Sequence, residues 1–332
     1  MIAYGSIIGN QQTWENFLTN VQMQDVPFLD WLPTGGKLVN AVHNYQTEKY
    51  RDPSTNAHKN GVPVTGFQAA GDSRAALVAR AHYSTKAAAV TTLHQDVTDN
   101  AAVEDELAHE IDKQNYELKT DLEGYLLDNS EAVVGVDGVT ATQTRSVGSW
   151  LSTSAHSVDD FDSNFRPASA SVSTTATGSI TEDSILDVLA SIRSVTRSRE
   201  PITAFMGASL KRWLNNRVFF LPSSASTQAS GVQYQKNLND RAIGRVMQRY
   251  EHDGGPVDFV IADYMHAIDG SATEKAWSAY FLHQSKWELR WNKKPTWMRK
   301  PYQGGSYEAF CEAIWMLLCK SPRGEGAYLP AS

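Results

Sequence analysis

Apolar residues between positions 99 and 129 recur at intervals of four and seven, which is typical of one face of a long helix. The β-branched sequence that begins at Thr91 predicts extended chain before this helix. Thr98–Asn100 offers three good N-cap residues, and neither Gly nor Pro then occurs before Gly124. A helix over 99–129, roughly 30 residues, would be a rod of about 45 Å. Its predicted apolar stripe consists of Val103, Leu107, Ile111, Leu118, Leu122 and Leu126.

The chain before this helix lacks the apolar residues needed for a core of its own. Residues 1–36 predict an arm with a short helix, interrupted at Pro27 and Pro33. Residues 37–94 contain two β-tending runs separated by a stretch rich in Pro, Asn and Gly, which predicts a long hairpin or extended loop. A two-stranded hairpin is marginally stable alone, so this segment is expected to pack on a neighbour, which could be another copy of the chain.

The residues after the helix predict a hairpin followed by a polar insertion. Asp137-Gly138 is flanked by valines in Val133–Val139, a signal typical of a tight hairpin turn. Residues 140–178 are rich in Ser, Thr and Ala, so we expect a solvated loop or insertion there.

An α/β unit is predicted over residues 181–260. Thr181 is an N-cap residue before a helix with a regular apolar face. Ile202–Met206 predicts a short buried strand, Gly207 a turn, and Ser209–Asn216 a second helix. Val257–Ile261 predicts a further strand, so strand and helix alternate as in α/β proteins.

The last third of the chain is predicted to be rich in β-structure. The expected strands are separated by turns at the sequences NKKP and QGGS. They cover Trp277–Trp291, Thr296–Tyr302 and Tyr307–Lys320.

Size and charge exclude several classes of protein. A chain of 332 residues can bury a sizeable core, so it is not a disulfide-stapled miniprotein. Its net charge of −7 argues against sequence-independent binding of DNA, which requires clustered cations. Cys311 and Cys319 lie in one predicted strand, about 26 Å apart, so they cannot bridge each other. No secretory signal or membrane-length apolar run is recognised, and we expect synthesis in a reducing cytoplasm.

Two acidic and histidine pairs are the candidate sites for chemistry. Glu106 and His109 have the spacing of carboxylate-bridged metal sites, but no second copy of the motif occurs, so a charged helix face is favoured. His94 and Asp96 could form half a metal site or an acid–base pair, and surface polarity is favoured for them in a strand. No catalytic, cofactor-binding or metal residue is therefore predicted.

Residues 287–302 interleave aromatic side chains with Lys and Arg, a composition that suits a nucleic-acid groove. Strand alternation offers another interpretation, because Trp287, Leu289 and Trp291 would share one face and Glu288 and Arg290 the other. We favour a core sheet here because the chain is acidic overall.

The order of these elements resembles the tailed-phage major capsid proteins of the Hong Kong 97-type fold, within the short-armed group typified by the phage with a very elongated head. The resemblance covers Val26 to the C-terminus. Its landmarks are DVPFLDWL, HNYQTEKY, the sequence of the long helix, ITEDSILDVLASI, ITAFMGASLKRWLNN, PVDFVIADYM and AYFLHQSKWELRW.

This resemblance implies an α+β capsid fold and assigns a part to each region. Residues 1–36 would form the N-terminal arm, and 37–94 the extended loop with its flanking strands. Residues 95–180 would form a peripheral domain with the spine helix 99–129 and the Ser/Thr-rich insertion. The axial domain would be 181–260, and 261–332 would supply the return strands of the peripheral domain.

The resemblance also implies a structural function, without catalysis or cofactor. The subunit would assemble into pentamers and hexamers of an icosahedral or elongated shell, with arm and extended loop contacting neighbouring capsomers. A separate scaffolding protein and a portal are expected, a decoration protein is possible, and packaged DNA would be touched by weak, non-specific contacts. The protein would be made in the host bacterial cytoplasm and reside in the virion capsid, with no membrane partner. No pattern selects Lys49 or Lys59 for cross-linking, so none is expected.

Three alternatives are compatible with the sequence. An encapsulin-like nanocompartment would share the fold but enclose protein cargo. A metal-dependent enzyme would use Glu106 and His109. A tail or head-completion protein would form rings or tubes instead of closed shells.

Overall fold

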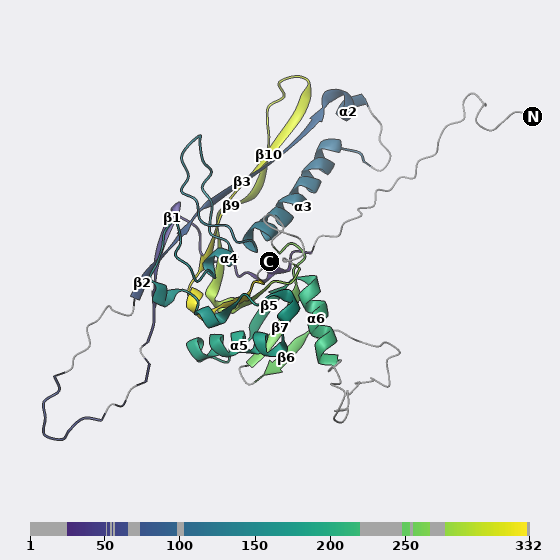
Figure 1. Ribbon diagram of the computed structural model, residues 1–332. Helices are drawn as coiled ribbons and strands as arrows, with labels where there is room; N and C mark the ends of the chain where they lie inside the picture. The colour runs from purple at the N-terminus through teal and green to yellow at the C-terminus, as the bar shows by residue number, and fades with distance from the viewer. Residues whose placement is uncertain are drawn as a thin grey trace, which may run out of the picture.

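The computed structural model describes residues 25–50, 52–53, 55, 57–65, 74–97, 103–219, 248–252, 255–265 and 276–330. In these residues the strands form three sheets, of two, three and six strands. Figure 1 shows the long strands and the spine helix running together toward one end of the molecule, with the six-stranded sheet and its helices at the other. The two-stranded sheet projects to the side and carries the extended loop.

The spine helix α3 (Glu106–Leu126) packs beside the three-stranded sheet of β3 (His82–Thr91), β10 (Ser306–Cys319) and β9 (Trp287–Arg299). All neighbouring strands of this sheet are antiparallel. The predicted stripe is confirmed from Leu107 onward. Its buried members are Leu107, Leu118, Leu122 and Leu126.

The predicted bounds 99–129 for this helix are wrong. The helix begins at Glu106, because the Asp105 carboxylate accepts a hydrogen bond from the Ala108 amide at 3.0 Å and caps it. Thr98–Asn100 lie outside the described residues, and Val103 precedes the helix. Thr92–Val97, expected to be extended, forms a separate helix α2.

The extended hairpin is confirmed in its two strands. Strand β1 (Val42–Glu48) pairs antiparallel with β2 (Arg74–Arg80). The β-tending run after the loop is two strands instead of one, because the chain changes partner at Ala81. Before this residue it pairs with β1, and after it β3 pairs with β10.

The six-stranded sheet has the order β4-β11-β8-β5-β7-β6. Strands β5 (Ile202–Met206) and β7 (Gly255–Ile261) are parallel, which confirms the predicted α/β unit. The remaining strands are β4 (Val172–Ser173), β6 (Arg249–His252), β8 (Ala279–Leu282) and β11 (Gly326–Tyr328).

The two helices of this unit also agree with the sequence. Helix α5 (Glu182–Thr196) begins with a capping box formed by Thr181 and Ser184, as expected for an N-cap threonine. Helix α6 (Ala208–Phe219) follows β5 directly after Gly207. A Cβ at position 207 would lie 2.5 Å from the Ala276 carbonyl oxygen, so this tight turn requires glycine.

The predicted turn at NKKP is wrong. Strand β9 continues through this sequence. The register of its pairing with β10 shifts on either side of Ile314, so the strands stay paired beyond it. Pro295 is tolerated because β9 is an edge strand of its sheet. The QGGS turn is confirmed by the positive φ angles of Gly304 and Gly305. The predicted strand Trp277–Trp291 is divided, because β8 joins the six-stranded sheet and β9 the three-stranded one.

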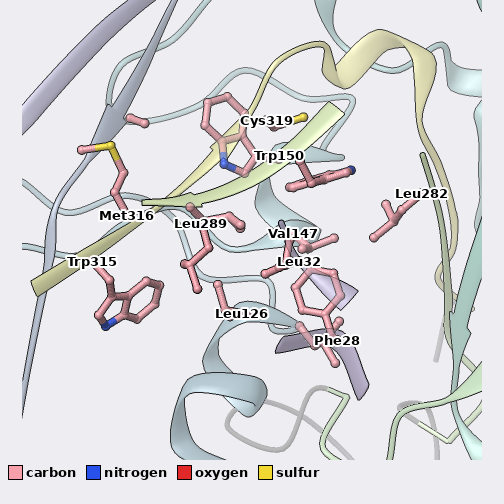
Figure 2. Packing of buried hydrophobic residues seen from close by; sticks show 14 of the residues in the cluster. Phe28, Leu32, Leu126, Val147, Trp150, Leu282, Leu289, Trp315, Met316 and Cys319 are labelled. Atoms are coloured by element: carbon pink, nitrogen blue, oxygen red, sulfur yellow. The ribbon is translucent and has the colours of Figure 1, made fainter. Parts of the chain in front are cut away.

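The Ser/Thr-rich stretch 140–178 is not a solvated loop. It contributes the short helix α4 (Val147–Trp150) and several large side chains to the core, although most of its residues are small and polar. Figure 2 shows Val147 and Trp150 among buried residues from the spine helix, the arm and β8. A few apolar anchors therefore suffice to bury this segment against elements that precede and follow it. The buried anchors are Val147, Trp150, Leu151, Phe161 and Phe165.

The valine-flanked hairpin before it is confirmed. Val133 pairs with Gln143 and Val136 with Thr140, and Gly138 adopts a φ of 72° in the turn.

We expect Trp150→Ala to destabilise the subunit by about 3–5 kcal/mol, because a fully buried indole would be replaced by a cavity. Urea unfolding followed by circular dichroism measures this change. Ser154→Ala, an exposed position in the same stretch, should have almost no effect. Equal stability of all three proteins would show that the stretch does not belong to the core.

Candidate interaction surfaces

The end of the N-terminal arm is held by a buried carboxylate. Helix α1 (Pro27–Trp31) lies against the spine helix, where Glu123 is fully buried. The two Glu123 carboxylate oxygens accept hydrogen bonds from the amides of Phe28 at 2.9 Å and Leu29 at 2.7 Å. These amides have no partner within so short a helix, so the carboxylate satisfies them. The described end of the predicted arm is thus part of its own subunit's core.

The same short helix reaches the six-stranded sheet. The Phe28 ring meets the Phe205 ring edge-on at 5.1 Å, and the Trp31 indole donates a hydrogen bond to the Thr203 hydroxyl at 3.0 Å. The chain then runs along the edge of β9, where Gly35 donates to the Leu289 carbonyl at 2.9 Å. The arm therefore joins the spine helix to both large sheets.

A partly buried ion pair and a buried arginine lie at the base of the hairpin that carries the extended loop. Arg80, near the end of β2, forms an ion pair with Asp159, and its Nη2 donates to the Asp159 Oδ1 at 2.8 Å. Arg145 is 1% exposed, and its guanidinium lies 4.7 Å from the Trp150 ring centre while it donates to the Val158 carbonyl at 2.7 Å. Burial lowers the pKa of Arg145, and the carboxylates of Glu131 and Asp159 oppose this shift.

The loop beyond this base is exposed throughout its described residues. The Tyr50 side chain is 88% exposed, and Val62 and Val64 are half-exposed or more. Among the described residues at the start of the loop, Asp52 forms an ion pair at 2.5 Å with Arg197, the residue that follows helix α5, and both side chains are mostly exposed. Such a pair contributes little stability, because solvent screens it. A cavity of about 610 Å³ lies between the start of the loop, at Lys49 and Tyr50, and the end of α5.

The structure places the candidate metal residues on two neighbouring helices, α2 and α3. Glu106 lies in the first turn of α3, and its carboxylate is 3.6 Å from the imidazole of His94. His94 and Asp96 lie in helix α2, so their assignment to a strand is wrong. Asp96 accepts a hydrogen bond from the Tyr307 hydroxyl at 3.2 Å. The described residues contain no group of three or more His, Cys, Asp or Glu side chains that could hold a metal ion.

Residues 287–302 are a core sheet in their first half. Trp287 and Leu289 are buried, as strand alternation predicts. Four of the five cations of this region, Arg290, Lys293, Arg299 and Lys300, have an acidic neighbour, which lowers their value for phosphate binding. The ion pairs join Arg290 and Lys320 to Glu288, Lys293 to Glu312, and Lys300 to Glu308.

Sequence reasoning missed the two residues that organise these surfaces, Glu123 and Arg145. A signal was available for Glu123, because it lies beside Leu122 and three residues before Leu126, on the buried side of the helix. Arg145 has no comparable signal, because its neighbours in sequence are small and polar. None of the described helices combines the length and the apolar character needed to cross a membrane.

Comparison with solved structures defines the class of fold. A capsid structure of cyanophage P-SCSP1u matches with a TM-score of 0.64 and 9% identity, covering 97% of this chain and 93% of that one. A structure from Mycobacterium phage Adephagia matches with a TM-score of 0.60 and 10% identity over 100% and 99%. The mature capsid of bacteriophage PhiM1 matches with a TM-score of 0.58 and 10% identity over 97% and 92%. The fold is that of Hong Kong 97-type phage capsid proteins, with mixed α+β structure.

The family of the chain follows from its sequence. The family model "SU10 major capsid protein" matches residues 2–318, and the chain belongs to this family. No curated protein matches the chain significantly. The protein is therefore a tailed-phage major capsid protein, a structural component of a virion shell and not an enzyme. The encapsulin, enzyme and tail-protein alternatives receive no support from this match.

The Glu123 anchor makes stability depend on pH. Burial raises the pKa of Glu123 to about 7 from an ordinary value of 4.5, although the two amide hydrogen bonds oppose the shift. A raised folded-state pKa means that this group's contribution is fully present below about pH 4.5 and is lost as the pH rises through 7.

We expect wild type to lose up to about 3 kcal/mol of unfolding free energy relative to Glu123→Gln between these two pH values, since one pKa unit is worth about 1.4 kcal/mol. Urea titrations at a series of pH values measure the difference. Asp112→Asn, an exposed position on the same helix, should follow wild type. A pH-independent difference between wild type and Glu123→Gln would contradict the assignment.

Proposed function

We propose that copies of this subunit enclose a double-stranded DNA genome and hold one another through the extended loop and the N-terminal arm, whose helix α1 stays in its own subunit. The exposed loop carries this proposal. It begins after strand β1, and its described residues 49, 50, 52, 53, 55 and 57–65 are all exposed in their own subunit. Such a segment becomes stable when it packs on another surface, and in a shell of identical copies that surface belongs to a neighbour.

The regions named from the sequence are proposed to act as assembly domains. Residues 37–94 form the extended loop and flanking strands, 95–180 the peripheral domain, and 181–260 the axial domain around pentamer and hexamer axes. The region 261–332 returns to the peripheral sheet through β9 and β10. Because β8 and β11 pair within the six-stranded sheet, we propose that this region also completes the axial domain.

The remaining partners are proposed from the net charge of the chain and the length of its N-terminal arm. An arm of 36 residues is short for a built-in scaffold, so a separate scaffolding protein and a portal are proposed, and a decoration protein is compatible with the exposed surface. With a net charge of −7, contacts with packaged DNA are weak and non-specific. Both cysteines are buried and unpaired, which agrees with synthesis in a host bacterial cytoplasm.

Deletion of the extended loop tests whether this loop holds neighbouring subunits together. Replacing residues 50–72 by a short Gly/Ser linker removes the exposed excursion and keeps the pairing of Glu48 with Arg74. We expect unchanged circular dichroism but small oligomers in place of closed shells, measured by sedimentation velocity and negative-stain electron microscopy. Inserting the same linker at Gly178, where open space surrounds the backbone, should leave assembly intact. Closed shells from the loop-deleted protein would overturn the exchange.

The contents of the particles test whether the shell encloses DNA. Wild-type particles produced with their genomic neighbours should contain nuclease-protected DNA. Particles filled with a protein cargo instead would contradict DNA enclosure.

We also expect mature particles to dissociate into single chains on a denaturing gel, because no lysine is held in a pattern that selects it for a covalent bond between subunits. A ladder of linked chains that persists in reducing sample buffer would contradict this expectation.

A further inference from the structure

Among the described residues, two that are not glycine have a positive backbone φ, and both form ion pairs with the segment that carries the extended loop. Asp159 has a φ of 50° and Arg197 a φ of 52°. This left-handed region is unfavourable for residues with a Cβ, although Asp tolerates it better than most. Asp159 pairs with Arg80 at the end of β2, and Arg197 pairs with Asp52 at the start of the loop. An unfavourable backbone conformation that is kept at such contacts points to a function for them.

The two ion pairs differ in geometry and burial. The Asp159 carboxylate accepts hydrogen bonds from two nitrogens of the Arg80 guanidinium, Nε and Nη2, the second at 2.8 Å. These two side chains are only 16% and 15% exposed. A bidentate pair fixes an angle as well as a distance. The pair of Asp52 with Arg197 is 79% and 53% exposed, so solvent screens it and it holds the loop only weakly.

The turn that presents Asp159 is itself firmly held. The buried Arg145 donates from Nη2 to the Val158 carbonyl at 2.7 Å and to the Asp159 carbonyl at 3.4 Å. On the other side, the Asp160 carboxylate accepts the His156 amide at 3.0 Å. The backbone is therefore fixed directly before and after the carboxylate that binds Arg80.

The Arg80–Asp159 pair lies where the chain passes from the hairpin to the body of the subunit. Arg80 is the last residue of β2, and the Ala81 amide after it still donates to the Ala41 carbonyl at 2.8 Å. From His82 onward the chain pairs with β10 instead. A contact at this junction sets the angle between the two sheets, and a small change of angle there moves the far end of the loop by a larger distance.

The other contacts of the hairpin leave this task to the ion pair. Leu77 and Ala79 of β2 are buried in the core, but apolar packing is not directional. The Tyr45 hydroxyl of β1 donates to the Cys319 carbonyl at 2.5 Å and so holds the other strand at one point. On β2 the directional contact with the body is that of Arg80.

We propose that Arg80 and Asp159 are positioning residues, which set the direction in which the hairpin carries the extended loop toward a neighbouring subunit. The inference rests on the proposed role of the loop in assembly. A loop that leaves its own subunit at a fixed angle is already oriented before a neighbour binds, and preorganisation of this kind lowers the entropic cost of association. In a closed shell every copy must meet its neighbours in a related geometry, so an error in this angle would be repeated at every contact.

Two conservative variants test the positioning. Arg80→Lys keeps the charge but cannot form the bidentate pair, and Asp159→Asn removes the charge but keeps a residue that tolerates positive φ. Both should fold, and both should lower the yield of closed shells at least about tenfold in favour of open or irregular assemblies. Sedimentation velocity and negative-stain electron microscopy measure the yield. Closed shells at the wild-type yield from both variants would overturn the proposal.

Two further variants are the controls. Asp52→Asn removes the exposed pair near the same hairpin and should assemble as wild type. Thr181→Ala removes the cap of α5, which lowers the unfolding midpoint without changing the base of the hairpin, and it should also form closed shells. A loss of shells from Thr181→Ala as large as that from Asp159→Asn would show that lowered stability is the cause, and would overturn the positioning role.

A distance measurement tests the angle directly. Both native cysteines are fully buried, so Gln46→Cys on β1 and Asp112→Cys on the spine helix supply two exposed positions for spin labels in the unassembled full-length chain. Double electron–electron resonance should give one narrow distance distribution in the wild-type background and with Asp52→Asn. The distribution should be broader with Arg80→Lys and with Asp159→Asn. Equal widths in all four backgrounds would overturn the proposal, even if the yield of shells fell.

The loop deletion described above separates this inference from the proposed function. Closed shells from the loop-deleted protein would contradict the proposed role of the loop. If the deletion abolishes closed shells while Arg80→Lys and Asp159→Asn assemble normally, the role of the loop stands and the positioning role of the ion pair is wrong.

Discussion

The buried Glu123 carboxylate is the interaction on which the arrangement of the subunit depends. It accepts two backbone amides of the arm from within the spine helix, and the arm in turn packs on Phe205 of the six-stranded sheet. A buried carboxyl group is costly unless it is satisfied, so the position of α1 is narrowly determined. Because α1 touches the spine helix and the six-stranded sheet, and the chain directly after it reaches β9 at Gly35, the position of the arm fixes how these parts meet.

The extended loop has the opposite character, since it is strongly held at its base and free beyond it. Arg80 and Asp159 form a partly buried ion pair, and the fully buried Arg145 donates to the Val158 carbonyl beside it. These contacts direct the hairpin away from the body, while the loop itself keeps its side chains in solvent. An element that is exchanged between subunits needs a fixed base and an exposed end, because the base sets the direction of the hairpin before a neighbouring subunit binds.

The extended loop is the part of the described chain that packs least on its own subunit. Its described residues keep their side chains exposed, while the strands that carry it pair with each other. A segment of this kind gains little stability alone, and because every copy of the chain carries it, a shell of identical subunits offers it many equivalent packing surfaces.

The sequence alone determined the elements with strong local signals: the apolar stripe of the spine helix, the cap at Thr181, the buried strand Ile202–Met206 and the glycine turn at Gly304-Gly305. Tertiary structure decided the rest, because the decisive contacts join residues far apart in the chain. Trp150 is buried in a segment of polar composition, α2 forms where β-branched residues predict a strand, and Glu123 meets an arm nearly a hundred residues away. Local periodicity reports which residues prefer burial, but only the fold supplies the partners that make the burial of a charge or an isolated aromatic favourable.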